Sequence, residues 1–332
     1  LFDLGFLYRI LFIAALLRLC MVFIKSVDII VVNWNSGHQL LECIDSVQQH
    51  GMLSVNRTIV VDNGSTDGSA ITVKNLPRVE VINTGKNLGF GKACNLGAKH
   101  AKSDYLLFLN PDATLYPHTL SKAMAFMQDP NNAHVGICGV QLLDESNHIS
   151  RSCTRFPSAK GFVLHAIGLD RFLPKLGHFM SEWDHSQTRQ VDHVIGAFFL
   201  VRRAVFESLN GFDERYFVYL EDLDFSLRAN KAGWKSFYLA HVQAFHAGGG
   251  TSNQVKARRL FYLLRSRILY AFKHFSLLGA SMVLLSTLFI EPLSRSVLAL
   301  SRRSWSTFKE TWSCYAMLWQ WLPSWVLKGC TR

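Results

Sequence analysis

Short apolar segments rich in Val, Ile and Leu alternate with stretches of helical character through the first third of the chain. Strands are predicted at residues 27–32, 58–61, 79–82 and 105–109, and helices at 37–49, 68–75 and 90–102. Because strands that are separated by helices pair in parallel through right-handed crossovers, this alternation predicts an α/β fold. We expect a mostly parallel central sheet that is flanked by helices.

The basic residues of the chain gather in its last quarter. Twelve Lys or Arg residues stand against two acids between positions 251 and 332, which accounts for +10 of the net charge of +11. Five of the eight Trp residues lie in the same stretch. Cationic and Trp-rich segments interleaved with apolar ones favour the surface of an anionic membrane. Nucleic acid is disfavoured as a partner, because these basic residues flank apolar runs instead of a polar groove.

Two further apolar segments concern the membrane. Leu277 to Ile290 is 14 residues long, shorter than the ~20 residues that span a bilayer. Its length favours an interfacial or re-entrant segment, with a true span as the alternative. Residues 1–24 are apolar but interrupted by three charges, which predicts a membrane-contacting helix and not a signal peptide. Translation could instead start at Met21, just before the first predicted strand. The seven cysteines show no Cys-x-x-Cys spacing, so neither a zinc site nor a disulfide framework is indicated.

Polar side chains follow the first two predicted strands, at the edge where open α/β sheets bind ligands. The first strand ends in Asn33-Trp34-Asn35 and the second in Asp62-Asn63-Gly64. The Asp62 carboxylate can accept the imide N–H of uracil or thymine, and Trp34 offers an apolar face. The same residue types also cap helices and form turns, so each motif alone leaves a structural role open.

A glycine-rich segment, Gly85 to Asn95, opens the third predicted helix. Backbone N–H groups at such a helix start, together with two lysines, are suited to phosphates. The segment is not a dinucleotide fingerprint, because the G-x-G-x-x-G pattern that starts at Gly89 meets Cys94 at its last position. It is not a Walker loop either.

Asp112 follows the most apolar predicted strand, in an Asn-Pro-Asp turn. A diphosphate leaving group needs its charge neutralised, and Mg²⁺ or Mn²⁺ does this with few protein oxygens plus the phosphates themselves. His246 could add a nitrogen ligand, but an isolated histidine usually has a structural role. Read with the polar edge, these features predict a protein that holds a nucleotide diphosphate.

An acidic cluster, Glu221-Asp222-Leu223-Asp224, follows the aromatic and apolar residues 216–220. Crowded carboxylates beside apolar groups have raised pKa values, which suits a general base. The alternative is a helix N-terminus with acids that favour the macrodipole. The cluster alone leaves both interpretations open.

Taken in order, these motifs resemble the family 2 glycosyltransferases, which are inverting enzymes with a GT-A fold, and especially their rhamnosyltransferase-like bacterial branch. The matching segments are 31–35, 61–68, 87–91, 109–112, 196–198, 211–217 and 221–228, followed by His246. The resemblance extends over residues 27 to 275. It implies a GT-A nucleotide-diphospho-sugar transferase fold with a helical, basic and apolar C-terminal tail that associates with membranes.

The resemblance also assigns roles to the acidic residues and to His246. Asp222 would be the catalytic base, with Glu221 and Asp224 as alternatives. Asp112 would be the last acid of the family's Asp-x-Asp motif and, with His246, a ligand of Mg²⁺ or Mn²⁺.

Donor binding would involve residues from several segments. Asp62 would contact the nucleotide base. Asn110 replaces the first acid of the Asp-x-Asp motif, which weakens metal binding there. The remaining donor-binding residues would be Asn33, Asn35, Asn63, Gly64, Asn87, Gly89, Asn95, Gly196, Ala197 and Arg228.

By the same resemblance, the chain would transfer L-rhamnose from dTDP-rhamnose to a polyprenyl-diphosphate-linked saccharide, in bacterial cell-surface (O-antigen-like) polysaccharide synthesis. A UDP-hexose or UDP-galactofuranose is the alternative donor. The expected place is the cytoplasmic face of the bacterial inner membrane, with peripheral or shallow insertion. We expect a nucleotide-sugar half at 25–112, an acceptor and catalytic half at 113–255, and a membrane tail at 256–332.

Two other protein classes remain as rivals. A nicotinamide enzyme needs a complete glycine fingerprint, which is missing here. A non-catalytic nucleotide-binding protein would tolerate loss of the acids, yet Asp62, Asp112, Asp222 and His246 all stand in the chain.

Overall fold

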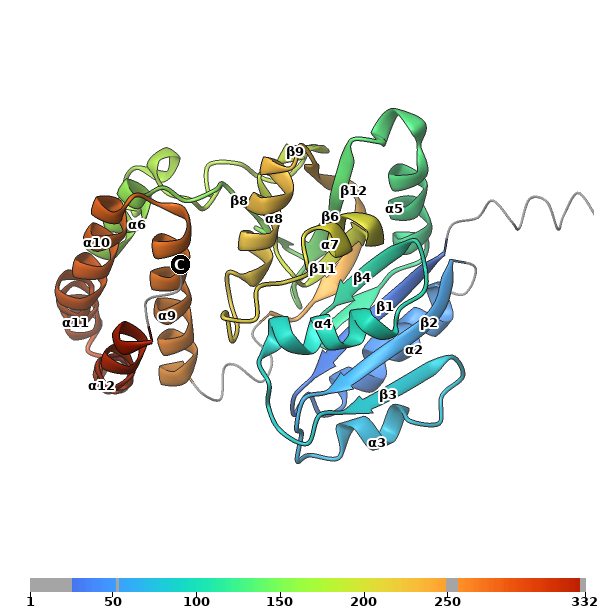
Figure 1. The fold of residues 1–332 in the computed structure, drawn as a ribbon, viewed down its shortest axis with the longest axis horizontal. Helices are drawn as coiled ribbons and strands as arrows, with labels where there is room; N and C mark the ends of the chain where they lie inside the picture. The colour runs from blue at the N-terminus through green and yellow to red at the C-terminus, as the bar shows by residue number, and fades with distance from the viewer. Residues whose placement is uncertain (1–25, 52–53, 249–255, 329–332) are drawn as a thin grey trace, which may run out of the picture.

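The computed structural model describes residues 26–51, 54–248 and 256–328. One ten-stranded sheet forms the centre of the body, helices cover both of its faces, and a lobe of helices lies to one side (Figure 1). The predicted helix within residues 1–24 falls outside the described residues.

The first half of the sheet is parallel. Its strands are β1 (Val27–Asn33), β2 (Val55–Asp62), β3 (Val79–Asn83) and β4 (Tyr105–Leu109), in the spatial order β3-β2-β1-β4. The connecting helices are α2 (Gln39–Gly51), α3 (Ser69–Val73) and α4 (Phe90–His100). Every residue of β1 and β4 is buried, as expected for parallel strands covered on both faces. The predicted strands and helices of this half are confirmed, with ends that shift by a few residues.

The second half of the sheet is mixed. Its strands are β5 (Ala113–Leu115), β6 (Val135–Leu143), β7 (Ile149–Ser150), β9 (Arg189–Val191), β11 (Phe198–Arg202) and β12 (Lys235–His246). Strand β11 lies between β4 and β6 and is antiparallel to both, whereas β12 is parallel to β6. Strands β8 (Cys153–Thr154) and β10 (His193–Val194) form a separate antiparallel pair. The sheet is thus continuous across position 112, and the predicted α/β fold is confirmed.

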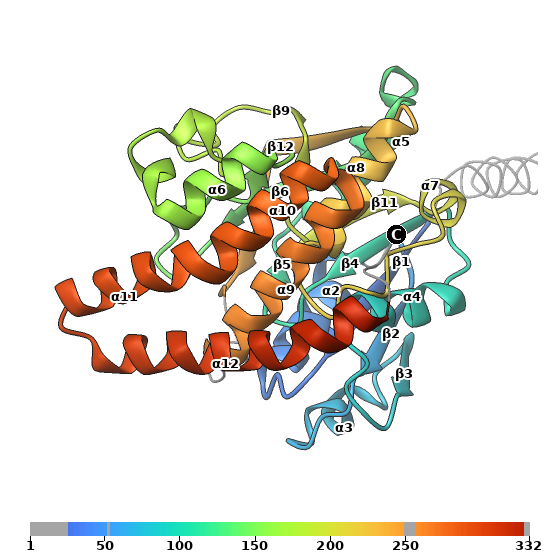
Figure 2. The same cartoon turned by 60° about the vertical axis from the view of Figure 1, so that its left-hand side comes forward.

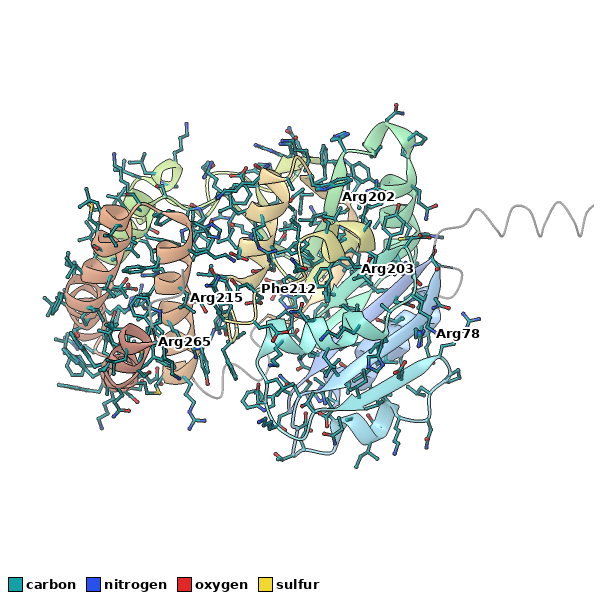
Figure 3. All side chains as sticks on the ribbon, viewed as in Figure 1. Arg78, Arg202, Arg203, Phe212, Arg215 and Arg265 are labelled. Atoms are coloured by element: carbon teal, nitrogen blue, oxygen red, sulfur yellow. The ribbon has the colours of Figure 1, made fainter. Side chains whose placement is uncertain are left out.

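Two apolar cores lie on the two faces of the sheet. Odd-numbered residues of β1 face α2 and α5 (Thr119–Gln128), whereas Ile30 and Val32 face α4, α7 (Arg203–Ser208) and α8 (Glu221–Lys231). On the second face, Phe212 packs against Phe108 and Phe225 and joins the loop before α8 to the sheet (Figure 3).

A third core belongs to the helical lobe, which lies beside α8 (Figure 2). Its helices are α6 (Ala159–Ile167), α9 (Lys256–His274), α10 (Leu277–Leu285), α11 (Glu291–Ser301) and α12 (Trp305–Leu327). Tyr216 and Leu223, which flank the N-terminus of α8, pack in this core with Leu264 and Ile268 of α9. The tail is therefore joined to the body through the predicted catalytic helix.

The apolar segment that begins at Leu277 is longer than predicted. Helix α10 continues through a π-helical turn, η5 (Ser286–Ile290), into α11, which gives one helix of 25 residues from Leu277 to Ser301. The wide turn lies directly before Pro292, whose missing N–H disturbs regular helical bonding. By length and composition, this is the one helix of the described residues that could cross a membrane, and 39% of its most apolar window is buried in the protein.

Candidate active site

The ends of β1 and β2 form a polar edge around Asn33 and Asp62. These two residues are paired in the sheet register and are both buried. The Asn33 Nδ2 group lies 3.2 Å from Asp62 Oδ1 and 2.8 Å from Ser69 Oγ. The Ser65 N–H also donates to Asp62 Oδ1. These contacts fix the orientation of the Asp62 carboxylate at the carboxyl end of the parallel strands.

Neighbouring side chains at this edge hold the loops in place. Asn35 Oδ1 accepts a hydrogen bond of 2.7 Å from the Thr66 N–H. Asn63 Nδ2 donates to Asn87 Oδ1 at 3.1 Å, and Asn63 Oδ1 accepts from the Leu88 N–H at 2.8 Å. The structure therefore places Asn35, Asn63 and Asn87 together, with polar groups engaged in contacts between loops.

The glycines of this edge permit close packing of backbone. A Cβ at Gly64, where φ is +79°, would lie 2.7 Å from the backbone carbon of Lys86. A Cβ at Gly89, where φ is +89°, would lie 2.5 Å from the Phe217 carbonyl oxygen. That oxygen accepts a 2.6 Å hydrogen bond from the Phe90 N–H at the start of α4. The sequence predicts that the N–H groups at this helix start face phosphates. For Phe90 this expectation is wrong, because its N–H already donates to the Phe217 carbonyl oxygen.

A second group gathers Asn110, Asp112 and His246. Strand β5 pairs with the end of β12, with Ala113 opposite His246. His246 Nε2 lies 3.3 Å from Asp112 Oδ1 and 3.4 Å from Asn110 Nδ2. A carboxylate oxygen and an imidazole nitrogen at this spacing suit a divalent cation whose other ligands come from phosphates and water. Within the described residues, no group of three or more His, Cys, Asp or Glu forms a complete metal site.

Asp222 lies at the N-terminus of α8, where both carboxylate oxygens have partners. Oδ2 accepts a 2.8 Å hydrogen bond from the Gly196 N–H, and Oδ1 accepts one of 2.8 Å from the Leu223 N–H. His193 Nε2 is 3.3 Å from Oδ2, an ion-pair distance without the alignment of a hydrogen bond. Its Nδ1 lies 2.9 Å from Thr154 Oγ1.

These contacts decide the charge of Asp222. Burial alone would raise its pKa, but His193 and the two backbone N–H groups outweigh burial and lower the pKa below the usual range. The carboxylate is thus ionised at neutral pH. With 15% of its side chain exposed, Asp222 remains accessible to a substrate hydroxyl.

The sequence predicts a raised pKa for the general base, but the acid whose pKa is raised is Glu221 and not Asp222. Burial and the adjacent charge of Asp222 raise the pKa of Glu221 well above its usual value. Its Oε2 is buried and has no hydrogen-bond partner among the described residues. The protonated form of Glu221 is therefore favoured relative to an ordinary Glu, and the expectation of a raised pKa is corrected for Asp222.

Two consecutive strained residues precede these acids. Tyr219 and Leu220 adopt φ angles of 69° and 66°, in the left-handed region that non-glycine residues rarely occupy. This backbone turns the chain sharply into α8, so that Asp222 meets the Gly196 N–H.

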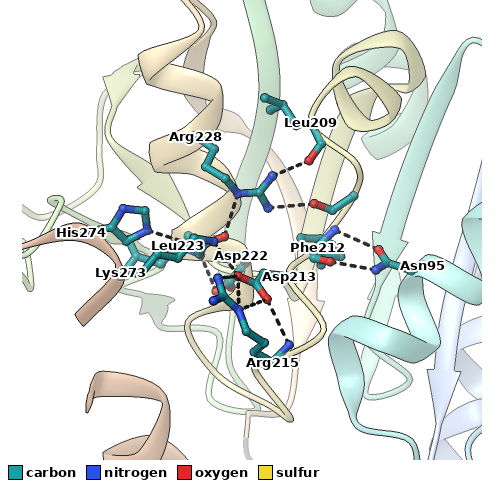
Figure 4. Close-up of polar contacts among 12 residues, drawn as sticks. Asn95, Leu209, Phe212, Asp213, Arg215, Asp222, Leu223, Arg228, Lys273 and His274 are labelled. Carbon is teal, nitrogen blue, oxygen red and sulfur yellow. Dashed lines mark hydrogen bonds and ion pairs between the residues drawn. The ribbon is translucent and has the colours of Figure 1, made fainter. Parts of the chain in front are cut away.

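Asp224 is the centre of an ion network, and Figure 4 labels its partners Arg228, Lys273 and His274. It is fully buried, and its oxygens lie 2.8 Å from Arg228 Nε, 2.6 Å from Lys273 Nζ and 2.7 Å from His274 Nε2. The sequence groups Asp224 with the candidate bases, but these three contacts leave it no access to a substrate. That assignment is corrected: Asp224 ties α8 to α9.

Arg228 and Asn95 have structural partners in the same network (Figure 4). Arg228 donates to the carbonyl oxygens of Leu209 and Gly211 at 2.6 and 2.8 Å. Asn95 exchanges two hydrogen bonds with the backbone of Phe212. Arg228 thus supports the loop before α8, and its predicted role in shaping the donor pocket stays a prediction. Asn95 supports this loop as well.

Replacing Asp224 by Ala is expected to destabilise the protein by roughly 3–5 kcal/mol, because the partly buried side chains of Arg228, Lys273 and His274 lose their shared buried partner. Burial would raise the pKa of Asp224, but His274, Arg228 and Lys273 lower it. Its contribution is therefore full above the unfolded-state pKa of about 4 and is lost as the pH falls through the lower folded-state pKa. Urea unfolding at neutral pH and at successively lower pH measures this difference.

Glu207→Ala is the matched control, because its carboxylate forms an exposed pair with Arg203. Such a pair contributes only about 0–1 kcal/mol. Equal stability losses in the Glu207 and Asp224 variants would contradict a central role of Asp224.

Gly196 and Ala197 connect the group around Asp112 with Asp222. The Ala197 carbonyl accepts a 3.0 Å hydrogen bond from the Asn110 N–H, while the Gly196 N–H donates to Asp222. A Cβ at Gly196 would lie 3.2 Å from Asp222 Oδ2. The backbone before β11 thus brings the catalytic candidate next to the metal candidates.

Sequence reasoning missed His193, Lys273 and Asp213. Lys273 lies 2.6 Å from both Asp213 and Asp224. Burial would raise the pKa of Asp213, but hydrogen bonds from Arg215 and Lys273 lower it. No local motif marks His193 or Lys273, whereas Asp213 lies in the matching segment 211–217 without an assigned role. Only the fold shows that α9 and β10 approach the N-terminus of α8.

A sheet with nucleotide-type loops at its carboxyl edge, and acids at Asp62, Asp112 and Asp222, defines a glycosyltransferase of the GT-A class. The chain belongs to glycosyl transferase family 2, whose family model matches residues 28–209. The predicted family and enzyme class are therefore confirmed.

Relatives agree with this assignment. The chain is 31% identical over 237 residues to an N-acetylglucosaminyl-diphospho-decaprenol L-rhamnosyltransferase of Mycobacterium tuberculosis, covering 66% of this chain and 75% of the relative. It is 33% identical over 168 residues to rhamnosyltransferase WbbL of Escherichia coli K12, covering 48% of this chain and 60% of that protein.

A solved structure shares the fold. Mannosyltransferase PcManGT from Pyrobaculum calidifontis, in complex with GDP-Man and Mn²⁺, superposes with a TM-score of 0.55 and 17% identity. The superposition covers 90% of this chain and 88% of that chain. It supports the GT-A fold assignment.

Proposed function

We propose that this protein transfers L-rhamnose from dTDP-rhamnose, with inversion, to a polyprenyl-diphosphate-linked saccharide that carries N-acetylglucosamine. The observation that carries the donor and acceptor classes is the 31% identity to the mycobacterial enzyme over 237 residues. The oriented Asp62, the pair Asp112 and His246, and the ionised Asp222 supply the parts that such a reaction needs.

The reaction is a single displacement in which Asp222 acts as the base. Its carboxylate accepts the proton of the acceptor hydroxyl while that oxygen forms a bond to the anomeric carbon. The bond from the anomeric carbon to the diphosphate oxygen breaks on the opposite side, and its electron pair leaves with the nucleoside diphosphate. Inversion of the anomeric centre follows. The Gly196 N–H and His193 hold Asp222 in place for this transfer.

Asp112 and His246 would hold a divalent cation, Mg²⁺ or Mn²⁺. Their oxygen and nitrogen lie 3.3 Å apart and suit a hard or borderline ion. When bound, such an ion neutralises charge that develops on the leaving diphosphate. At the other end of the donor, Asp62 would accept the imide N–H of the base, with Asn33 fixing its orientation.

The tail would keep the enzyme at the anionic cytoplasmic face of a bacterial inner membrane, where a lipid-linked acceptor is found. Its net charge of +10 supports this placement. The five described cysteines are free and buried, as suits a reducing compartment. Residues 25–112 would bind the nucleotide sugar, 113–255 would bind acceptor and perform catalysis, and 256–332 would contact the lipid.

Radiolabelled transfer to polyprenyl-diphosphate-N-acetylglucosamine tests the donor. We expect turnover with dTDP-rhamnose and little with UDP-glucose, UDP-galactose or UDP-galactofuranose, because pocket polar groups reject a mismatched sugar strongly. NMR of the product should show inversion at the anomeric carbon. Transfer from a UDP-sugar alone would replace the donor assignment while keeping the enzyme class.

A further inference from the structure

The exposed large hydrophobic residues of this protein are concentrated on the helical lobe. Among the described residues, all of them except Ile71 and Ile149 lie within 167–179 or 277–327. These two segments are far apart in sequence but adjacent in space, because α6 packs against α10 and α11. The Ser294 hydroxyl of α11 donates to the Ala166 carbonyl of α6 at 2.7 Å. Their apolar side chains therefore belong to one lobe.

The helix from Leu277 to Ser301 has two distinct faces. Seven of its nine exposed large apolar residues recur at helical spacing and form one stripe, and Leu277 and Ile290 lie beside it. The stripe consists of Leu278, Met282, Leu285, Phe289, Leu293, Val297 and Leu300. The opposite face is buried, and there Glu291 pairs with Arg267 of α9 and, at 2.7 Å, with Arg295. Contacts with both arginines lower the pKa of Glu291 although burial opposes this. The helix is thus bound to the protein along its whole length.

This binding argues against a transmembrane orientation. A helix that crossed the bilayer would take α9 with it, because α9 packs against α10 and joins Glu291. Helix α9 contains six Lys or Arg residues, which are costly in hydrocarbon. An orientation in the plane of the interface exposes the stripe to acyl chains and leaves α9 outside them.

Residues 167–179 carry a second exposed apolar element on the same lobe. Between η2 (Leu169–Arg171) and η3 (Pro174–Leu176), Phe172 is 80% exposed and Leu173 is 50% exposed, followed by Leu176 and Phe179. Lys175 is exposed among them. At the end of the stripe, exposed Arg302 and Arg303 stand beside Trp305, which is 66% exposed. Aromatic and cationic side chains around an apolar face match an anionic headgroup region.

We propose that residues 167–179 and the 277–301 stripe together form a composite membrane-binding surface that lies in the interface of an anionic bilayer. The tail alone is therefore not the membrane anchor: the segment that follows β8 also enters the lipid. The role of this surface depends on the proposed function, because binding to the membrane would bring Asp222 to a lipid-linked acceptor. Vesicle binding tests it without any sugar transfer.

The experiment is co-sedimentation of the full chain with vesicles of phosphatidylcholine and phosphatidylglycerol. Phe172→Glu with Leu176→Glu, and separately Met282→Glu with Val297→Glu, should each weaken binding by roughly tenfold or more, because each removes two apolar insertions. Ile71→Glu is the matched control: Ile71 is 75% exposed but lies on α3, so its variant should bind as the wild type does. Circular dichroism and nucleotide binding confirm folding of each variant.

Depth-dependent quenching tests the in-plane orientation. Fluorophores on cysteines introduced as Leu278→Cys and Leu300→Cys, with the labelled unsubstituted protein as background, should report similar shallow depths although the sites are roughly 33 Å apart along the helix. Wild-type binding by the Phe172 and Leu176 variant would remove that segment from the surface. Opposite depths at Leu278 and Leu300 would establish a spanning helix, and a dimer that covers the stripe in solution would assign it to a second copy. Each of these outcomes overturns the proposal.

Discussion

Asp222→Asn is expected to lower the turnover rate by roughly 10²–10⁴-fold, the usual contribution of a positioned general base. Asn keeps the shape of the side chain and can still accept the Gly196 N–H, so donor binding should change little. The loss should therefore appear in kcat and not in the dissociation constant of the nucleotide. Radiolabelled transfer measures the first quantity, and calorimetric titration with dTDP measures the second.

Glu221→Gln is the control for this prediction. Because burial and the adjacent Asp222 raise the pKa of Glu221 and so favour its protonated form, Gln resembles that form, and activity should stay within a few-fold of wild type. If Glu221→Gln were inactive while Asp222→Asn retained transfer, Glu221 would be the base. Retained transfer in both variants would place the base outside the acidic cluster.

The behaviour of Asp222 with pH adds an independent test. Its lowered pKa keeps the carboxylate ionised at and well below neutral pH. The acid limb of the kcat profile should consequently lie at or below the ordinary Asp value of about 4. In His193→Gln, which removes a contact that lowers this pKa, the acid limb should move to higher pH.

The parallel half of the fold could be predicted because its signals are local. Buried strands such as β1 read as unbroken β-branched runs, and each is followed by a helix. The second half could not be ordered in the same way. Strand β11 inserts antiparallel between β4 and β6, and these partners come from distant parts of the chain. Pairing of this kind depends on tertiary packing and leaves no periodicity in the sequence.

The candidate site shows the same division between local and distant information. The proximity of Asp112 and His246 follows from resemblance, and the pairing of β5 with β12 provides it physically. The different fates of Glu221, Asp222 and Asp224 could not be foreseen, because they depend on partners that approach from β10 and α9. Three acids within four positions thus differ in environment: the pKa of Glu221 is raised, that of Asp222 is lowered, and Asp224 forms ion pairs with α8 and α9.

Asp112→Asn is expected to lower transfer by about 100-fold when Mn²⁺ is present, which corresponds to about 3 kcal/mol of lost charge stabilisation at the leaving diphosphate. Asn can still fill the space beside His246, but it lacks the negative charge that attracts a divalent cation. Turnover as a function of Mn²⁺ and Mg²⁺ concentration measures the effect. His246→Ala should give a smaller loss, because it leaves the Asp112 carboxylate in place to attract the cation.

A readout independent of turnover separates metal binding from catalysis. In the wild type, Mn²⁺ should tighten the binding of dTDP, whereas in Asp112→Asn the dissociation constant should no longer depend on the metal. Asp144→Asn is the matched control, since Asp144 accepts hydrogen bonds only from its own exposed turn. Because Asn110 stands where the family has an acid, Asp112 supplies the one carboxylate of the group formed by Asn110, Asp112 and His246. Equal, metal-free transfer by wild type and Asp112→Asn would therefore show that cationic side chains, and not a divalent ion, stabilise the leaving diphosphate.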